Sequence, residues 1–154
     1  LEVTLAIILA SITRGVIISF ISVLVFSYMI DISIQNYFIF SIYIFFSGFI
    51  LGAAGFIAGL WAEKFDNMAS ATNFIIVPLS FLSGTFYSIK RLPEILQKVS
   101  EWNPFFYMID GFRYGFLGVS DGSLKFGIFY LIILSFLTWF VSYVLFKKGY
   151  KIKS

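Results

Sequence analysis

The sequence predicts an all-α, polytopic membrane protein with four transmembrane helices and an extracytoplasmic re-entrant helix pair between the third and the fourth. Three observations support this class. Of the 154 residues, 60% are hydrophobic and only 12% are charged, whereas soluble domains are about 45–50% apolar and about 25% charged. The mean hydropathy is +0.95. Four apolar stretches have the length of about 20 residues that a helix needs to cross a bilayer.

The four apolar stretches define one transmembrane domain over residues 1–154. They cover residues 7–30, 37–61, 68–87 and 126–146. The third stretch is the least hydrophobic because it contains Asn73 and Pro78. The first stretch carries Arg14, close to the predicted cytoplasmic boundary. This side chain is either an anchor that reaches the lipid headgroups or a charge that faces a polar conduit between helices.

The long connection between the third and fourth stretches predicts the re-entrant pair, over residues 91–118. Leu92 and Pro93 open an amphipathic helix, since proline is favoured near a helix start. The dipeptide Asn103-Pro104 ends this helix, because the residue before a proline disfavours the helical conformation. A second apolar helix follows that is too short to cross the membrane. We therefore expect a segment that enters the bilayer and turns back.

The basic residues predict the orientation of the chain. Four lysines follow the fourth stretch, at Lys147, Lys148, Lys151 and Lys153. Such a cluster is typical of the cytoplasmic side. Counting back through four crossings places Lys64 and the N-terminus inside and the long connection outside. Basic residues also occur in that connection, but acidic residues are interspersed among them.

Glycines recur at helical spacing in the second apolar stretch. They are Gly48, Gly52, Gly55 and Gly59. On a helix these positions fall on one stripe, where small residues allow a second helix to approach closely. The partner is either another span of the same chain or a second subunit. The same spacing recurs in the long connection, at Gly111, Gly115, Gly118 and Gly122.

Residues that carry enzyme chemistry are scarce in this chain. It has no histidine and no cysteine, which excludes imidazole bases, thiol nucleophiles and metal sites built from these ligands. No phosphate-binding loop of the G-x-x-x-x-G-K-S/T type occurs. We therefore expect no catalytic, cofactor or metal site, and we expect a partner to supply the energy for any transport.

Two charged residues stand out in the second helix of the re-entrant pair. Asp110 and Arg113 are three residues apart and share one helical face, so we expect them to pair with each other rather than to contact a passing substrate. An alternative function is a membrane-embedded enzyme that modifies lipids, with Asp110 and Glu101 as acid and base.

Three short motifs occur in order along the second half of the chain. They are Phe81-Leu82-Ser83-Gly84-Thr85-Phe86-Tyr87, then Leu92-Pro93, then Asn103-Pro104-x-x-Tyr107-x-x-Asp110-x-x-Arg113. Together they resemble the C-terminal part of the ABC-2 type transporter permeases. In that family the first motif ends the fifth span, the second opens an outer re-entrant pair, and the third leads toward the sixth span. The resemblance covers essentially the whole chain.

The resemblance implies the last four of six spans of a permease in the bacterial cytoplasmic (inner) membrane, with a cytoplasmic C-terminus. Leu1 and Glu2 would be the remnant of a helix that contacts the ATPase. The re-entrant pair would guard the outer exit. A separate ATP-binding subunit would hold ATP and magnesium, so that this chain needs no cofactor of its own.

The implied function is the membrane subunit of an ATP-driven ABC exporter. It would move an amphipathic, drug-like, lipid or polysaccharide substrate outward. We expect a homodimer or a permease heterodimer, in contact with membrane lipid and not with nucleic acid. The remaining alternative is a truncated fragment that does not transport.

Overall fold

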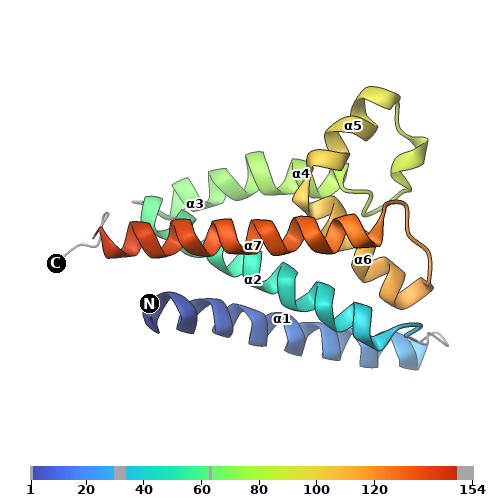
Figure 1. Ribbon diagram of the computed structural model, residues 1–154, viewed down its shortest axis with the longest axis horizontal. Helices are drawn as coiled ribbons and strands as arrows, with labels where there is room; N and C mark the ends of the chain where they lie inside the picture. Colours follow the sequence, from blue (N-terminus) through green and yellow to red (C-terminus); the bar gives the residue numbers. More distant parts are fainter. Residues whose placement is uncertain (1, 30–33, 63, 149–154) are drawn as a thin grey trace.

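The computed structural model describes residues 2–29, 34–62 and 64–148. Within these ranges every regular element is helical, which confirms the all-α class. In chain order the helices are α1 (Glu2–Met29), α2 (Tyr37–Trp61), α3 (Phe65–Ala71), η1 (Thr72–Ile76), α4 (Val77–Leu82), η2 (Ile89–Arg91), α5 (Glu94–Trp102), α6 (Pro104–Leu117) and α7 (Leu124–Lys147). The N-terminal end of α1 and the C-terminal end of α7 lie at the same end of the molecule (Figure 1).

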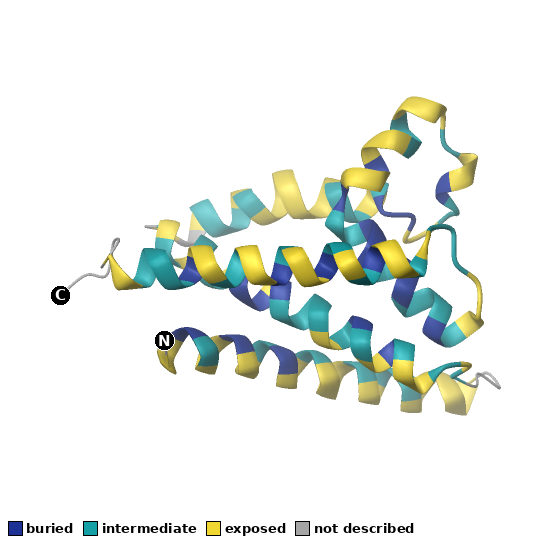
Figure 2. Cartoon of the chain, in the orientation of Figure 1, coloured by how far each residue is buried: buried dark blue, intermediate teal, exposed yellow. Residues whose placement is uncertain are grey.

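Three of these helices, α1, α2 and α7, are long and apolar enough to cross a membrane. They correspond to the first, second and fourth predicted spans. The bounds of α2 agree with the prediction, whereas α1 begins earlier, at Glu2, and the predicted end of the first span at residue 30 lies outside the described residues. The outer faces of α1 and α7 are largely exposed, whereas most residues of α2 are intermediate or buried (Figure 2). Apolar faces without protein contacts fit a lipid environment.

The third predicted span is built differently from the other three. It consists of α3, η1 and α4, and η1 is a π-helix in which the Val77 N–H donates to the Thr72 carbonyl. Pro78 explains the wider turn, because its ring would collide with a carbonyl one turn earlier in a regular α-helix. The expected end at Tyr87 is wrong. The helix ends at Leu82, where Gly84 adopts a left-handed φ of 77° that glycine tolerates.

The core consists of two clusters of buried side chains. The larger one joins α2, α6, α7 and η2 through Tyr43, Ile50, Ile89, Phe106, Tyr107, Met108 and Leu131. The smaller one joins α1 to α2 through Ile8, Ile12 and Ala53, with Trp139 of α7 packed against it. The helix α6 therefore packs against α2 and α7 at the end of the molecule opposite the termini (Figures 1 and 2).

The predicted break between two short helices is confirmed. The helix α5 ends at Trp102, and Asn103 has an extended conformation with φ −81° and ψ 117°. Its side-chain oxygen accepts a hydrogen bond from the Phe105 N–H at 3.0 Å, which caps α6. The first helix does not begin at Leu92, because Leu92 and Pro93 are extended and α5 starts at Glu94. The location of the pair relative to the bilayer stays a prediction.

Candidate functional site

Residues 83–123 lie together at the end of the molecule opposite the termini, and we term them the head segment (Figure 1). They contain η2, α5, α6 and the turn that leads into α7. All seven residues of the proposed gate motif lie here. They are Leu92, Pro93, Asn103, Pro104, Tyr107, Asp110 and Arg113. Their hydrogen bonds show what each of them does in the fold.

Asp110 anchors the turn between α6 and α7. It is buried, with 3% of its surface exposed. One carboxylate oxygen accepts from the backbone N–H of Asp121 at 2.7 Å, and the other accepts from the Ser120 hydroxyl at 2.7 Å and the Gly122 N–H at 3.0 Å. Such hydrogen bonds compensate the cost of burying a charge. Both oxygens of the carboxylate therefore accept hydrogen bonds from the turn, which argues against a role of Asp110 as a free acid or base.

Arg113 pairs with Asp121 and not with Asp110, so the predicted pair is wrong. Its Nη1 lies 3.1 Å from Asp121 Oδ2, and its Nη2 donates to the Gly84 carbonyl. The turn that Asp110 anchors contains Asp121 and places the Asp121 carboxylate beside the Arg113 guanidinium. Sequence spacing shows only which residues share a helical face, and here a neighbouring loop supplies the partner instead.

Asp121 also holds the segment that follows α4. Its Oδ1 accepts from the Ser88 hydroxyl at 2.8 Å and lies 3.8 Å from Lys90 Nζ. Its Oδ2 accepts from the Ile89 N–H at 3.3 Å. One carboxylate thus joins η2, α6 and the start of α7. The sequence alone did not indicate this role, because Asp121 stands in a Ser-Asp-Gly run that is typical of any turn.

The remaining motif residues fasten α5 and α6 to their neighbours. Asn103 Nδ2 donates to the Leu79 carbonyl of α4 at 2.6 Å, and Pro104 occupies the first turn of α6, where its missing N–H costs nothing. The Tyr107 hydroxyl donates to the Glu101 carbonyl at 2.9 Å. Burial raises the pKa of the Tyr107 phenol, and the negative charge of Glu101 adds to the rise. Leu92 packs against the larger core cluster.

In the part of the chain that the structure describes, only two of the four glycines in the first series pack closely against another helix. A Cβ on Gly48 would lie 3.2 Å from the Ile12 Cα, and one on Gly52 would lie 2.7 Å from the Ser11 Cβ. These two glycines therefore allow α1 to approach α2, which supports the internal-contact alternative for them. Gly55 and Gly59 have no such neighbour within 4 Å. The predicted continuous stripe therefore ends after Gly52 among the described residues.

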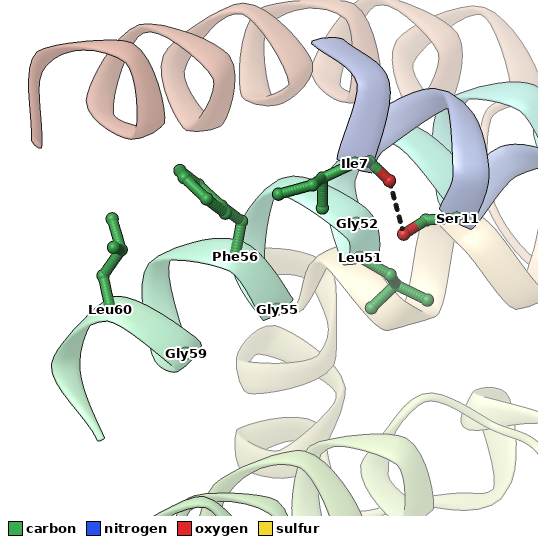
Figure 3. Close-up of a pocket in the computed structure, with 8 residues that line it drawn as sticks. All are labelled: Ile7, Ser11, Leu51, Gly52, Gly55, Phe56, Gly59 and Leu60. Carbon is green, nitrogen blue, oxygen red and sulfur yellow. Dashed lines mark hydrogen bonds between the residues drawn. The ribbon is translucent and has the colours of Figure 1, made fainter. Parts of the chain in front are cut away.

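Gly55 and Gly59 line an open groove between α1 and α2 (Figure 3). Its volume is about 310 Å³. The groove offers little polar chemistry, because the Ser11 hydroxyl already donates to the Ile7 carbonyl at 3.1 Å within α1. Its other side chains come from Leu51, Phe56 and Leu60.

The second glycine series contributes the tightest contacts of α6. A Cβ on Gly111 would collide with the ring of Tyr43, and one on Gly115 would lie 2.8 Å from the Phe40 Cβ. Tyr43 is 1% exposed, and its hydroxyl donates to the Leu124 carbonyl at 3.0 Å. The spacing of the glycines was visible in the sequence, but their partner on α2 was not.

The predicted terminal and charged sites are less informative. Glu2 is exposed at the start of α1, whereas Leu1 lies outside the described residues. Arg14 is exposed along α1, and neither of its two predicted roles is tested. Within the part of the chain that the structure describes, no group of three or more acidic side chains is placed to hold a metal ion.

Residues 1–117, from the start of the chain to the end of α6, match the model of a known family, the ABC-2 type transporter. The chain belongs to this family. The resemblance drawn from the motifs is thus confirmed. No solved structure gives a significant match to this ABC-2 type chain.

Curated relatives of this ABC-2 type chain include the inner membrane transport permease YadH of Escherichia coli strain K12. It is 29% identical over 145 residues, which cover 93% of this chain and 56% of YadH. YadH of Shigella flexneri matches to the same extent. Nodulation protein J of Sinorhizobium fredii is 27% identical over 96 residues, 62% of this chain and 37% of that protein. The chain thus spans just over half the length of the YadH relatives.

Proposed function

We propose that the chain is part of the permease subunit of an ATP-driven exporter of the bacterial inner membrane. The match of residues 1–117 to the ABC-2 type transporter family carries this proposal. The three apolar helices of spanning length agree with it. The relatives named as inner membrane transport permeases support the location and the transport role. The substrate we propose is amphipathic, drug-like, lipid or polysaccharide.

The path of the chain supports a fourth crossing through α3, η1 and α4. These elements run from Phe65 to Leu82, and 18 helical residues extend about 27 Å, close to the hydrocarbon thickness of about 30 Å. They begin at the end of the molecule where α2 ends and finish at the head segment (Figure 1). Phe74 in their middle is 80% exposed, as expected for a residue that faces lipid or another subunit.

Four crossings give the orientation that we propose. Lys64 precedes α3, and Lys147 and Lys148 end α7. These helix ends lie at the end of the molecule opposite the head segment (Figure 1). By the positive-inside rule this end is cytoplasmic, and the head segment is then the outer, re-entrant gate. Lys151 and Lys153 lie outside the described residues.

The energy source in this proposal is a separate ATP-binding subunit, which carries ATP and magnesium and docks near Glu2. The permease forms a homodimer or a heterodimer, and rigid-body movement of the two subunits opens the path outward. The hydrogen bonds within the head segment are consistent with such movement, because they hold the head segment together as one rigid unit.

Copurification tests this proposal. The permease is coexpressed with an ABC-type ATP-binding protein from the same organism, and the complex is isolated in dodecyl maltoside. We expect the two proteins to copurify and the ATP hydrolysis rate to depend on the permease. A permease that binds no ATP-binding subunit and leaves hydrolysis unchanged contradicts the proposal. A lipid product that appears with the wild type and is lost in Asp110→Asn and Glu101→Gln variants would instead establish the enzyme alternative.

A further inference from the structure

A second cavity lies within the head segment, between α5, α6 and the start of α7. Its volume is about 280 Å³, just below the usual range of about 300–1,000 Å³ for small-molecule sites. The residues that line it include two acidic ones, Glu101 and Asp121, and three aromatic ones, Phe106, Tyr107 and Phe126. No basic residue is among the residues that line it. The cavity therefore has the size for one small group and walls of a single charge sign.

The two carboxylates differ in their partners. Asp121 is neutralised, because Arg113 lies 3.1 Å and Lys90 3.8 Å from its oxygens. Glu101 is exposed, and among the described side chains no basic group lies within ion-pair distance of its carboxylate. Its backbone is held by the Tyr107 hydroxyl at 2.9 Å. Among the described side chains, Glu101 thus contributes a carboxylate without an ion-pair partner to the lining of the cavity.

The rings form a continuous aromatic wall. The ring centroids of Phe106 and Tyr107 are 5.0 Å apart, and those of Tyr107 and Phe126 are 5.6 Å apart. Aromatic rings attract a cation through their quadrupole, and sites for quaternary ammonium groups combine several of them. An anion would be repelled by the unpaired carboxylate of Glu101, and a neutral apolar group would leave Glu101 without a partner.

We propose that this cavity binds an alkylammonium group, with Glu101 as the charge partner and the rings of Tyr107 and Phe126 as its walls. The group belongs either to a free organic cation or to a lipid headgroup. Binding is measured without transport, so that failure of this proposal leaves the proposed exporter function untouched.

Equilibrium dialysis of the purified permease in dodecyl maltoside tests the proposal, with radiolabelled choline as the probe. We expect saturable binding of choline and much weaker competition by 3,3-dimethylbutan-1-ol, its neutral isostere. The Glu101→Gln change should weaken binding by up to about fivefold, the upper end of the range for an exposed ion pair. The Phe126→Ala change should weaken it about twofold to fivefold, the contribution of one ring.

Matched variants on the same helices are the controls. Glu94→Gln removes an exposed carboxylate of α5, and Phe129→Ala removes an exposed ring of α7, and neither residue lines the cavity. Both should bind choline as the wild type does. Because Glu101 and Phe126 are also exposed, their variants should keep the wild-type helix content by circular dichroism. Added phosphatidylcholine should compete if the ligand is a headgroup, and should have no effect if it is a free cation.

Three results would each overturn the proposal. The first is the absence of saturable choline binding. The second is equal competition by the neutral isostere, which would make the cavity a merely apolar site. The third is unchanged affinity in the Glu101→Gln and Phe126→Ala variants, which would place the bound choline elsewhere.

Discussion

A single methyl group at Gly111 tests the packing of α6 against α2. In a Gly111→Ala variant the new Cβ collides with the Tyr43 ring, which is 1% exposed and has no free space to enter. Overpacking a core costs about 1–3 kcal/mol. Displacing Tyr43 also breaks its hydrogen bond to the Leu124 carbonyl, which adds about 1 kcal/mol. The higher helix propensity of alanine offsets about 0.5–1 kcal/mol of this loss in the free energy of unfolding. We expect a net loss of about 1–3.5 kcal/mol in the free energy of unfolding.

The matched control is Gly55→Ala, on α2, where a Cβ has no neighbour within 4 Å. It should be as stable as the wild type or more stable by up to about 1 kcal/mol. Both variants are purified in dodecyl maltoside and unfolded with increasing sodium dodecyl sulfate, and helix content is followed by circular dichroism. If Gly111→Ala proves no less stable than Gly55→Ala, then Tyr43 is not packed on Gly111 and the described contact between α2 and α6 is wrong.

Three further predictions concern packing, the head segment and orientation. Gly52→Leu should destabilise the contact of α1 with α2 by about 2 kcal/mol or more, whereas Gly55→Leu should change the unfolding midpoint little. Equal effects of the two changes in the same detergent titration would contradict the finding that only Gly52 of this pair packs against α1. Asp121→Asn should remove two ion pairs and lower the free energy of unfolding by about 1–3 kcal/mol. Limited proteolysis should then cut the segment between α4 and α5 faster than in the wild type. An unchanged cleavage rate would show that Asp121 does not hold this segment. These 154 residues contain no cysteine, so single Glu94→Cys and Lys148→Cys variants are labelled in intact cells and then purified to read the label at the introduced thiol. An impermeant maleimide should label only the first, and the reverse pattern would invert the proposed orientation.

The long helices could be predicted because the bilayer sets their length and polarity. The bounds of α2 follow directly from an uninterrupted apolar run of 25 residues. The break at Asn103 could also be predicted, since proline restricts the residue before it. Both rules depend on the local sequence alone.

The partners of the charged residues could not be predicted, because they depend on how the chain folds back. Spacing placed Asp110 and Arg113 on one face, but it could not show that the turn after α6 brings Asp121 to the guanidinium. The same limit applies to Gly111, whose contact with Tyr43 joins residues of two separate helices. The π-helical turn of η1 was missed as well, although Pro78 was its visible signal.

The bonds of Asp110 also constrain the order of events during biosynthesis. Among the described residues, its carboxylate accepts hydrogen bonds from residues 120–122, which leave the ribosome after α6 is complete. Likewise, the hydroxyl of Tyr43 on α2 donates to the carbonyl of Leu124, which is synthesised 81 residues later. Until then each of these polar groups needs water or the insertion machinery as a partner. These hydrogen bonds therefore form only after the turn that follows α6 and the start of α7 have been synthesised.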